Sequence, residues 1–303
     1  TAVFRREIDR AAESRKSDAD GLIVGLKDLL GFSYETQSYP SGREISRATV
    51  KAALDFYNRS FSNLKGTVAV FSGIDLKDTG SIALVNRYLG SIPGPGQSPM
   101  EDLVLKARDK ETRIEVVNPT ESTSRADVNL LFTKMAPLDQ RKEISLRLAC
   151  AIVTEVLSER IRRKEGGTYS VDGSPKFLAP NRGSRDRISI YKVSFLCSPE
   201  RADALVEAAK EEIAKLRAGQ IDQSLLEVAK KNYADWNLPE NFQEYNWNYQ
   251  LAVNVRSGGD IADITKRKEI LSALTVADIA GSIGEFMDSR YLIYYKELPK
   301  LDR

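Results

Sequence analysis

An arginine and a tyrosine that stand seven positions apart, Arg162 and Tyr169, form the most promising chemical pair in the sequence. Arg162 closes a long stretch with helical periodicity, and Gly166 and Gly167 lie between it and Tyr169. Two glycines let the backbone turn sharply off a helix, so the tyrosine hydroxyl could lie over the helix end beside the guanidinium. Such donors suit a peptide carbonyl or a developing oxyanion. The residues alone favour a plainer interpretation, which is a helix C-cap followed by a strand-forming aromatic.

A basic cluster surrounds the arginine of this pair, since four of the five residues from Arg160 to Lys164 are cationic. Such a cluster could bind a phosphate or a carboxylate. It is more typical of the last turn of a helix, where cations complement the partial negative charge of the helix end. Glu155 and Glu159 also precede Arg163 at helical spacing, which predicts ion pairs along one face.

Aromatic residues crowd a third segment, which holds both tryptophans of the chain. One interpretation is a wall that grips an extended peptide or a sugar, with Trp236 and Trp247 as its substrate-binding residues. The alternative is packing, because three of the other aromatics share one helical face. The six residues are Tyr233, Trp236, Phe242, Tyr245, Trp247 and Tyr249.

The residue types that are missing restrict the chemistry further. The 303 residues include no histidine, which excludes Ser–His–Asp and Cys–His catalysis and every zinc site that uses imidazole. The two cysteines, Cys150 and Cys197, lie in apolar stretches and indicate buried thiols, although a disulfide stays open. We therefore assign no metal ligand. A formal charge of +2 does not point to nucleic acid, and no apolar run approaches the roughly 18–20 residues of a membrane span.

The elements that must position these residues are predicted from hydrophobic periodicity. The long helix at 139–164 carries two neighbouring apolar stripes, and a face that wide indicates burial against a sheet. Strands and helices come in groups, which favours an α+β fold with an antiparallel or mixed sheet flanked by helices. Other helices are predicted at 21–30, 46–61, 78–89 and 199–216, and from positions 222, 239, 264 and 276. Strands are predicted at Thr67–Phe71, Leu103–Ala107, Thr112–Val117, Val128–Thr133, Tyr169–Val171, Arg187–Cys197 and Tyr291–Lys296.

An internal repeat predicts how the chain divides into domains. Thr49-Val50 and Thr275-Val276 each open a helix that a short strand follows, at an offset of 226 residues. A repeat of that size indicates a duplicated domain. We expect residues 1–99 to be the tail of a preceding domain plus a linker, Ser91–Pro99, and residues 100–303 to be one complete domain.

The stretch Glu155–Ser174, EVLSERIRRKEGGTYSVDGS, resembles the insulinase/pitrilysin family of zinc metallopeptidases. Its run of a long helix, two glycines and a tyrosine matches that family's pattern. Three further pieces, Thr49–Asp75, Cys197–Gly219 and Thr275–Pro299, agree with the family in the same order, so the resemblance covers most of the chain. It implies tandem α/β domains of the insulinase/mitochondrial-processing-peptidase type.

The resemblance also implies where the catalytic metal belongs. The family binds zinc through an inverted H-x-x-E-H motif in an early domain, and this chain has no histidine. Zinc is therefore expected in another domain of the parent protein, and this chain alone should bind no cofactor and hydrolyse nothing. In the family's last domain an arginine and a tyrosine reach the zinc site, and the motif carries these roles to Arg162 and Tyr169.

The expected function is the substrate-binding and chamber-forming C-terminal part of a zinc endopeptidase. Its partners would be the N-terminal catalytic half and a peptide substrate, with Gly166 and Gly167 at the substrate side. Family members suggest the bacterial periplasm or cytoplasm. One alternative is a non-catalytic scaffold of the same fold, which has no use for Arg162 and Tyr169. Another is a nucleic-acid binder, which the small net charge opposes.

Overall fold

A five-stranded mixed sheet organises the described part of the chain. The computed structural model describes residues 2–13, 30–31, 46–61, 69–71, 75, 77–92, 104–106, 110–118, 123–179, 185–242, 244–256, 260 and 262–299. The strands run in the order β1-β5-β2-β4-β3; β1 pairs with β5 in parallel, and the other pairs are antiparallel. Their bounds are Thr112–Asn118 (β1), Ala126–Pro137 (β2), Val171–Leu178 (β3), Asp186–Cys197 (β4) and Leu292–Pro299 (β5). The predicted α+β class with a mixed sheet is confirmed.

The central strands β2 and β4 are buried on both faces because side chains alternate across a sheet. On one face, Leu130 lies opposite Val193 and Phe132 opposite Tyr191, within the main core. On the other face, Leu131 and Ile190 belong to a second, smaller apolar cluster, which Leu30 and Leu105 join from the N-terminal part of the chain. The sheet therefore has a thick core on one side and a thin apolar layer on the other.

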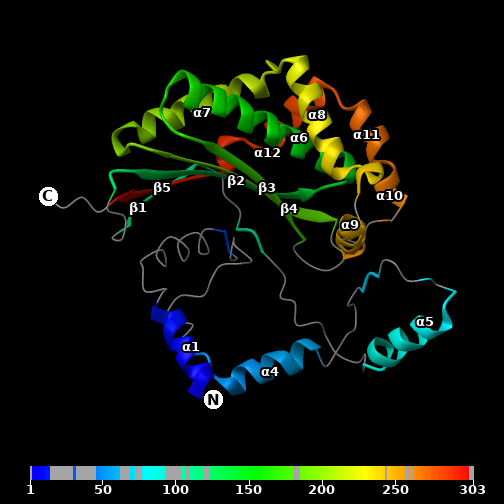
Figure 1. Ribbon diagram of the computed structural model, residues 1–303. Coiled ribbons are helices and arrows are strands. Elements are labelled where there is room, and N and C mark those ends of the chain that lie inside the picture. The colour runs from blue at the N-terminus through cyan, green and yellow to red at the C-terminus, as the bar shows by residue number, and fades with distance from the viewer. Residues whose placement is uncertain are drawn as a thin grey trace.

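Helices cover the main face of the sheet (Figure 1). The long helix α6, Gln140–Leu157, starts at its N-cap Asp139 and continues as the π-helical segment η2, Ser158–Lys164. Both of its predicted stripes face the core, since Ile144, Leu148, Ile152, Val153, Leu157 and Ile161 are buried. Its neighbours are α7 (Ala202–Arg217), α8 (Gln223–Asn237), α11 (Arg267–Ala273) and α12 (Val276–Phe286). Shorter elements are α9 (Glu244–Arg256), α10 (Ala262–Thr265) and the turns η3 (Pro199–Arg201), η4 (Pro239–Asn241) and η5 (Ser289–Tyr291).

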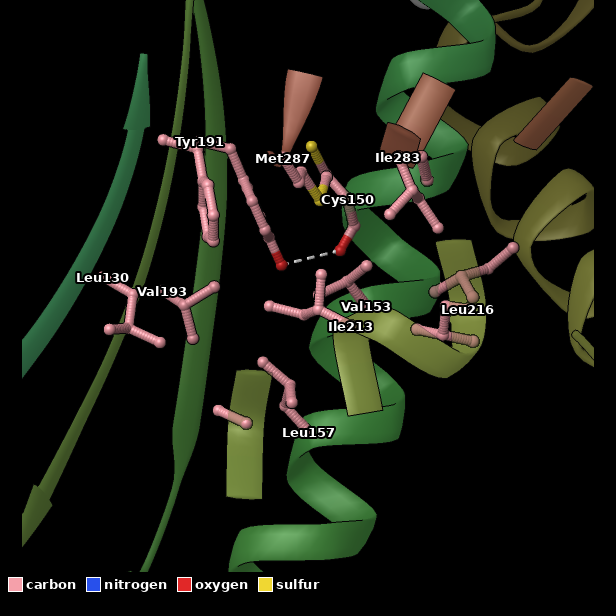
Figure 2. Close-up of a cluster of buried hydrophobic side chains, with 14 of the residues drawn as sticks. Leu130, Cys150, Val153, Leu157, Tyr191, Val193, Ile213, Leu216, Ile283 and Met287 are labelled. Carbon is pink, nitrogen blue, oxygen red and sulfur yellow. Dashed lines mark hydrogen bonds between the residues drawn. The ribbon is translucent and has the colours of Figure 1, made fainter. Parts of the chain in front are cut away.

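A buried polar bridge ties β4 to α6 (Figure 2). The Tyr191 hydroxyl donates to the backbone oxygen of Cys150 at 3.0 Å and lies 2.8 Å from Thr154 Oγ1. Burial raises the pKa of Tyr191 well above its ordinary value, so the phenol stays a donor. Cys150 and Cys197 are free, buried thiols, and burial raises the pKa of Cys197 to about 11. The interpretation as two buried thiols is confirmed.

The N-terminal part contributes α1 (Ala2–Glu13), α4 (Val50–Phe61), α5 (Thr79–Val85) and the π-helical η1 (Asn86–Gly90). Figure 1 places α1 and α4 on the side of the sheet opposite α6. The two helices that the expected repeat relates, α4 and α12, begin with similar contacts. Thr49 Oγ1 accepts from the Ala52 backbone N–H at 3.1 Å, and Thr275 Oγ1 accepts from that of Asp278 at 3.3 Å. However, α12 buries its apolar face, whereas α4 exposes its own.

Three strand predictions fail over residues that the structure describes. Ala69–Phe71 and Val104–Lys106 form no strand, and β3 begins at Val171 rather than at Tyr169. A short apolar segment becomes a strand only when a neighbouring strand accepts its hydrogen bonds. Lys106 instead donates its backbone N–H to the Leu30 oxygen at 2.9 Å. The predicted helix at 21–29 and the linker at 93–99 lie outside the described residues, and the domain boundaries stay a prediction.

Candidate functional site at the end of the long helix

The helix that carries Arg162 widens before it ends. From Ser158 to Lys164 the backbone is π-helical, and the Glu165 N–H reaches the Arg160 oxygen at 3.1 Å, five residues back. Such π-helical turns are uncommon and occur often at functional sites. The wider turn changes the directions in which the cationic side chains leave the helix, which hydrophobic periodicity could not reveal.

Gly166 and Gly167 close the helix as the sequence predicted. Gly166 has φ +58°, a left-handed conformation that favours glycine, and its N–H donates to the Arg162 oxygen at 3.1 Å. The Gly167 N–H donates to the Ile161 oxygen at 2.9 Å. These bonds satisfy the carbonyl groups that a helix end leaves without partners. The chain then reverses and returns Tyr169 beside the last helical turn.

Arg162 and Tyr169 come together at this turn. The guanidinium carbon of Arg162 lies 5.7 Å from the centroid of the Tyr169 ring, within cation–π range. Tyr169 is 88% exposed, so its hydroxyl is open to solvent. Among the described residues, no carboxylate pairs with Arg162. The pair therefore presents a positive charge and a phenol donor on one accessible surface. That this surface is concave stays a prediction.

An arginine and a glutamate that the sequence did not single out, Arg201 and Glu165, help to hold the turn in place. Arg201, in η3, donates from Nη1 and Nη2 to the Glu165 backbone oxygen, both at 3.2 Å, and lies 3.4 Å from its carboxylate. Arg160 pairs with the same carboxylate and lies 3.5 Å from Glu212. Glu165 thus joins the helix end to η3, and Arg160 links it to α7 through Glu212. The position of Glu165 directly after a basic cluster was the one sequence signal for this contact. The sequence around Arg201 gave no such signal.

The ion pairs that the spacing of the basic cluster predicted are present in the structure. Arg163 pairs with Glu159 at 2.6 Å and with Glu155 at 3.5 Å, along one helical face. These carboxylates raise the pKa of Arg163, so the guanidinium stays charged. Arg160 and Arg163 therefore form ion pairs within the fold, whereas Arg162 forms none with the residues that the structure describes.

The structure does not gather the two tryptophans into one wall. Trp236 is 71% exposed on α8. Trp247, on α9, packs edge-to-face against Phe242 with ring centroids 5.1 Å apart. Residues of α9 lie against the first turns of α6, whereas Arg162 and Tyr169 lie at the other end of that helix. Any role of Trp236 and Trp247 in binding substrate stays a prediction.

The described residues do not suit a zinc ion. No group of three or more Asp, Glu or Cys side chains among them could hold a metal, and histidine is missing from the whole sequence. Burial raises the pKa of both thiols, which disfavours the thiolate that zinc would need. In the described part of the chain, no helix is both long and apolar enough to cross a membrane.

Comparison with protein families decides the relationship. The family model described as the peptidase M16 inactive domain matches residues 47–233, more than half of the chain. The chain belongs to the peptidase M16 inactive-domain family. The match starts near α4, includes η2 and the Gly166–Gly167 turn, and ends within α8. The resemblance to insulinase-type zinc metallopeptidases is thereby confirmed.

Individual M16 relatives agree with this assignment. The chain is 26% identical over 215 residues to a zinc protease PQQL-like protein of Arabidopsis thaliana, covering 66% of this chain and 22% of that protein. The periplasmic protease PqqL of Escherichia coli superposes with a TM-score of 0.73 at 18% identity, over 99% of this chain and 32% of PqqL. A peptidase M16 inactive domain of Pseudomonas fluorescens gives 0.77 at 15% identity, over 100% of this chain and 71% of that chain. The M16 chain described here thus spans about a fifth to a third of the PQQL-type proteases.

Proposed function

We propose that this chain is the substrate-binding and chamber-forming C-terminal part of an M16 zinc endopeptidase, and that it supplies Arg162 and Tyr169 to a zinc site in another domain. The observation that carries the proposal is the Arg162–Tyr169 contact at 5.7 Å on an exposed helix end. Its partners would be the N-terminal half of the same protein and a peptide. The zinc would supply charge stabilisation to the reaction, and none of the described residues here is suited to bind it.

The pair has the properties that a substrate-orienting site requires. The Tyr169 hydroxyl would donate to a carbonyl oxygen of the peptide, and Arg162 would hold the ring while adding positive charge nearby. Donors of this kind are useful only when they are held in place before the reaction. The turn meets that requirement, because Arg201 and Arg160 fix Glu165 and two backbone hydrogen bonds fix the glycines.

The alternatives draw less support from the geometry. Binding nucleic acid would need free cations, but Arg160 and Arg163 are engaged with glutamates. A scaffold of the same fold would not need an exposed arginine without a carboxylate partner beside an exposed tyrosine. For location, PqqL of Escherichia coli is described as periplasmic; we propose a periplasmic or cytoplasmic location for this chain.

Single substitutions in the full-length protein test the catalytic role. Tyr169→Phe keeps the ring and removes the hydroxyl, so it should lower peptidase turnover by about tenfold to a hundredfold. That is at or below the smallest loss, about 100-fold, that removing one oxyanion donor typically causes. Arg162→Ala should act in the same direction, and the double variant should lose less than the product of the two effects.

The matched control is a second exposed pair, Arg87 and Tyr88. The Arg87 guanidinium lies 5.6 Å from the Tyr88 ring, and Tyr88 is 64% exposed. Tyr88→Phe should leave turnover unchanged. If a folded Tyr169→Phe enzyme cleaves peptides at the normal rate, the catalytic role is wrong and the scaffold interpretation gains.

A further inference from the structure

The helix α4 turns a largely apolar face toward solvent. Its larger apolar side chains are between 40% and 63% exposed, and the rings of Tyr57 and Phe61 pack together with centroids 5.0 Å apart. The exposed residues are Val50, Leu54, Phe56, Tyr57 and Phe61. The opposite side of the helix is polar and carries an ion pair between Lys51 and Asp55 at 2.9 Å. A contiguous apolar face of this kind usually marks an interface.

The expected repeat relates this face to one that is buried. At the offset of 226 residues, the N-cap Thr275 of α12 corresponds to Thr49, which precedes α4. The core-facing residues Val276, Ile279, Ala280, Ile283 and Met287 correspond to Val50, Ala53, Leu54, Tyr57 and Phe61. All five are buried or half-buried around α12, where they face α6, α7 and β2, whereas all five of their α4 counterparts are exposed. The face of α4 is therefore the one that a covering helix occupies on α12.

A second element agrees with this correspondence. The segment Ala69–Phe71 follows α4 as β5 follows α12, and it forms no strand. Ala69 is exposed, whereas its counterpart in β5, Tyr295, is 4% exposed. A helix and the segment after it thus both lack the neighbours that their counterparts have.

The elements that cover α12 have no counterpart within the 303 residues. At the same offset, both α6 and α7 would fall before residue 1. The relatives are long enough to hold such elements, because the chain spans 32% of PqqL and 22% of the Arabidopsis thaliana protein. A second copy of this chain offers no free α6, since its own α12 lies on that helix.

The partner of α4 must differ from α6 at one position. In the last domain, the hydroxyl of Ser282 on α12 lies 2.7 Å from that of Ser145 on α6, so two small side chains meet where these helices approach. The α4 residue that corresponds to Ser282 is Phe56, which is 63% exposed. A phenyl ring would overlap a serine at that separation, because helix interfaces pack as densely as cores.

We propose that α4 docks on a long amphipathic helix of a preceding domain of the same protein, and that this helix carries Gly or Ala opposite Phe56. The aromatic pair of Tyr57 and Phe61 would fill the groove beside that small residue. The pairings of α4 and of α12 would then not be interchangeable, because the ring that fits one partner overlaps the other. The docking surface is independent of the Arg162–Tyr169 pair and of the proposed peptidase role.

Maleimide labelling of engineered cysteines tests the docking without using activity. Tyr57→Cys lies on the apolar face, and the matched control Asp55→Cys lies on the polar side of the same helix. The native thiols of Cys150 and Cys197 are buried, and peptide mass spectrometry locates the label. In the dilute 303-residue chain the two variants should label at rates within about threefold. In the full-length protein Tyr57→Cys should label at least about tenfold more slowly than Asp55→Cys.

Hydrogen exchange gives a second reading in case the cysteine loosens the contact. In the unsubstituted proteins, the α4 amides should exchange at least about tenfold more slowly in the full-length protein than in the 303-residue chain. Phe56→Trp should remove that protection by overpacking, whereas Lys51→Trp on the polar side should leave it intact. Equal labelling of the two cysteine variants in the full-length protein overturns the proposal. So does protection that rises with protein concentration, which would assign the face to a second copy, or protection that Phe56→Trp leaves unchanged.

Discussion

Leu205 lies directly against Gly167, and this contact leaves no room for a side chain on the turn that carries Tyr169. A Cβ at position 167 would come within 2.8 Å of both methyl carbons of Leu205. Methyl groups can usually move aside, but Leu205 is 1% exposed in the main core and has nowhere to go. Packing against α7 therefore requires a glycine at position 167, and the tight turn favours one there as well.

Gly167→Ala should destabilise the chain by about 1–3 kcal/mol, as overpacking a core typically does. In the full-length protein it should also lower the proposed peptidase turnover, because the turn must shift and Tyr169 moves with it. Urea denaturation of the 303-residue chain measures the first effect. Leu205→Ala restores the space, so the double variant should lose less than the sum of the single losses. If the two stability losses were strictly additive, the Gly167–Leu205 contact would not be the cause of the loss in Gly167→Ala.

Gly173→Ala should be among the most damaging substitutions in β3. A Cβ there would lie 1.9 Å from Thr154 Oγ1, which is held by the Cys150 oxygen and the Tyr191 hydroxyl at 2.8 Å each. We expect a loss of about 3 kcal/mol, measured by urea denaturation. The control, Gly281→Ala on α12, meets no atom within 4 Å and should gain about 0.5–1 kcal/mol. Equal effects at the two glycines would contradict the packing argument.

Asp288 should make stability depend on pH in the acid range. The backbone N–H of Arg290 lowers the pKa of this carboxyl, burial opposes that effect, and the guanidinium groups of Arg290 and Arg217 lower the pKa further. A lowered pKa means that the carboxylate stabilises the fold above the ordinary value of 3.8, and that this contribution is lost as the pH falls through the folded-state pKa.

Asp288→Asn should accordingly cost about 1–2 kcal/mol at neutral pH, and the difference from the unmodified chain should shrink below about pH 4. Denaturation midpoints at several pH values measure it. Asp235→Asn, on an exposed position of α8, controls for the loss of one carboxylate. A penalty that stays constant down to pH 2 would rule out ionisation of Asp288 as its cause.

The exposed face of α4 should make the isolated chain self-associate. Leu54, Tyr57 and Phe61 are each more than half exposed on one side of this helix, and contiguous apolar surface of this kind usually marks an interface. Leu54→Ser combined with Phe61→Ser should weaken association at least about tenfold in sedimentation experiments. Lys51→Ser with Asp55→Ser, an exposed ion pair on the same helix, should not. In the full-length protein the apolar pair should instead contribute to stability, as expected if a preceding domain covers it.

The amino-acid sequence by itself determined the features that depend on local patterns. The stripes of α6 predicted a helix buried against a sheet, and the glycines at 166 and 167 predicted its end, because periodicity and backbone freedom are properties of neighbouring residues. The missing histidine excluded whole classes of active site. The spacing of Arg162 and Tyr169 around a helix end allowed their contact, but the family resemblance was needed to prefer it over a plain C-cap.

Only the tertiary structure decided which segments pair and which residues meet across the chain. Ala69–Phe71 and Val104–Lys106 read as strands but form none, because β structure needs a partner whose position no local pattern specifies. The clamp of Arg201 on Glu165 spans 36 residues, and Tyr233 and Arg267 reach one cavity from two helices. Contacts at such separations arise when helices settle on a common sheet, so the packing of the whole core creates them.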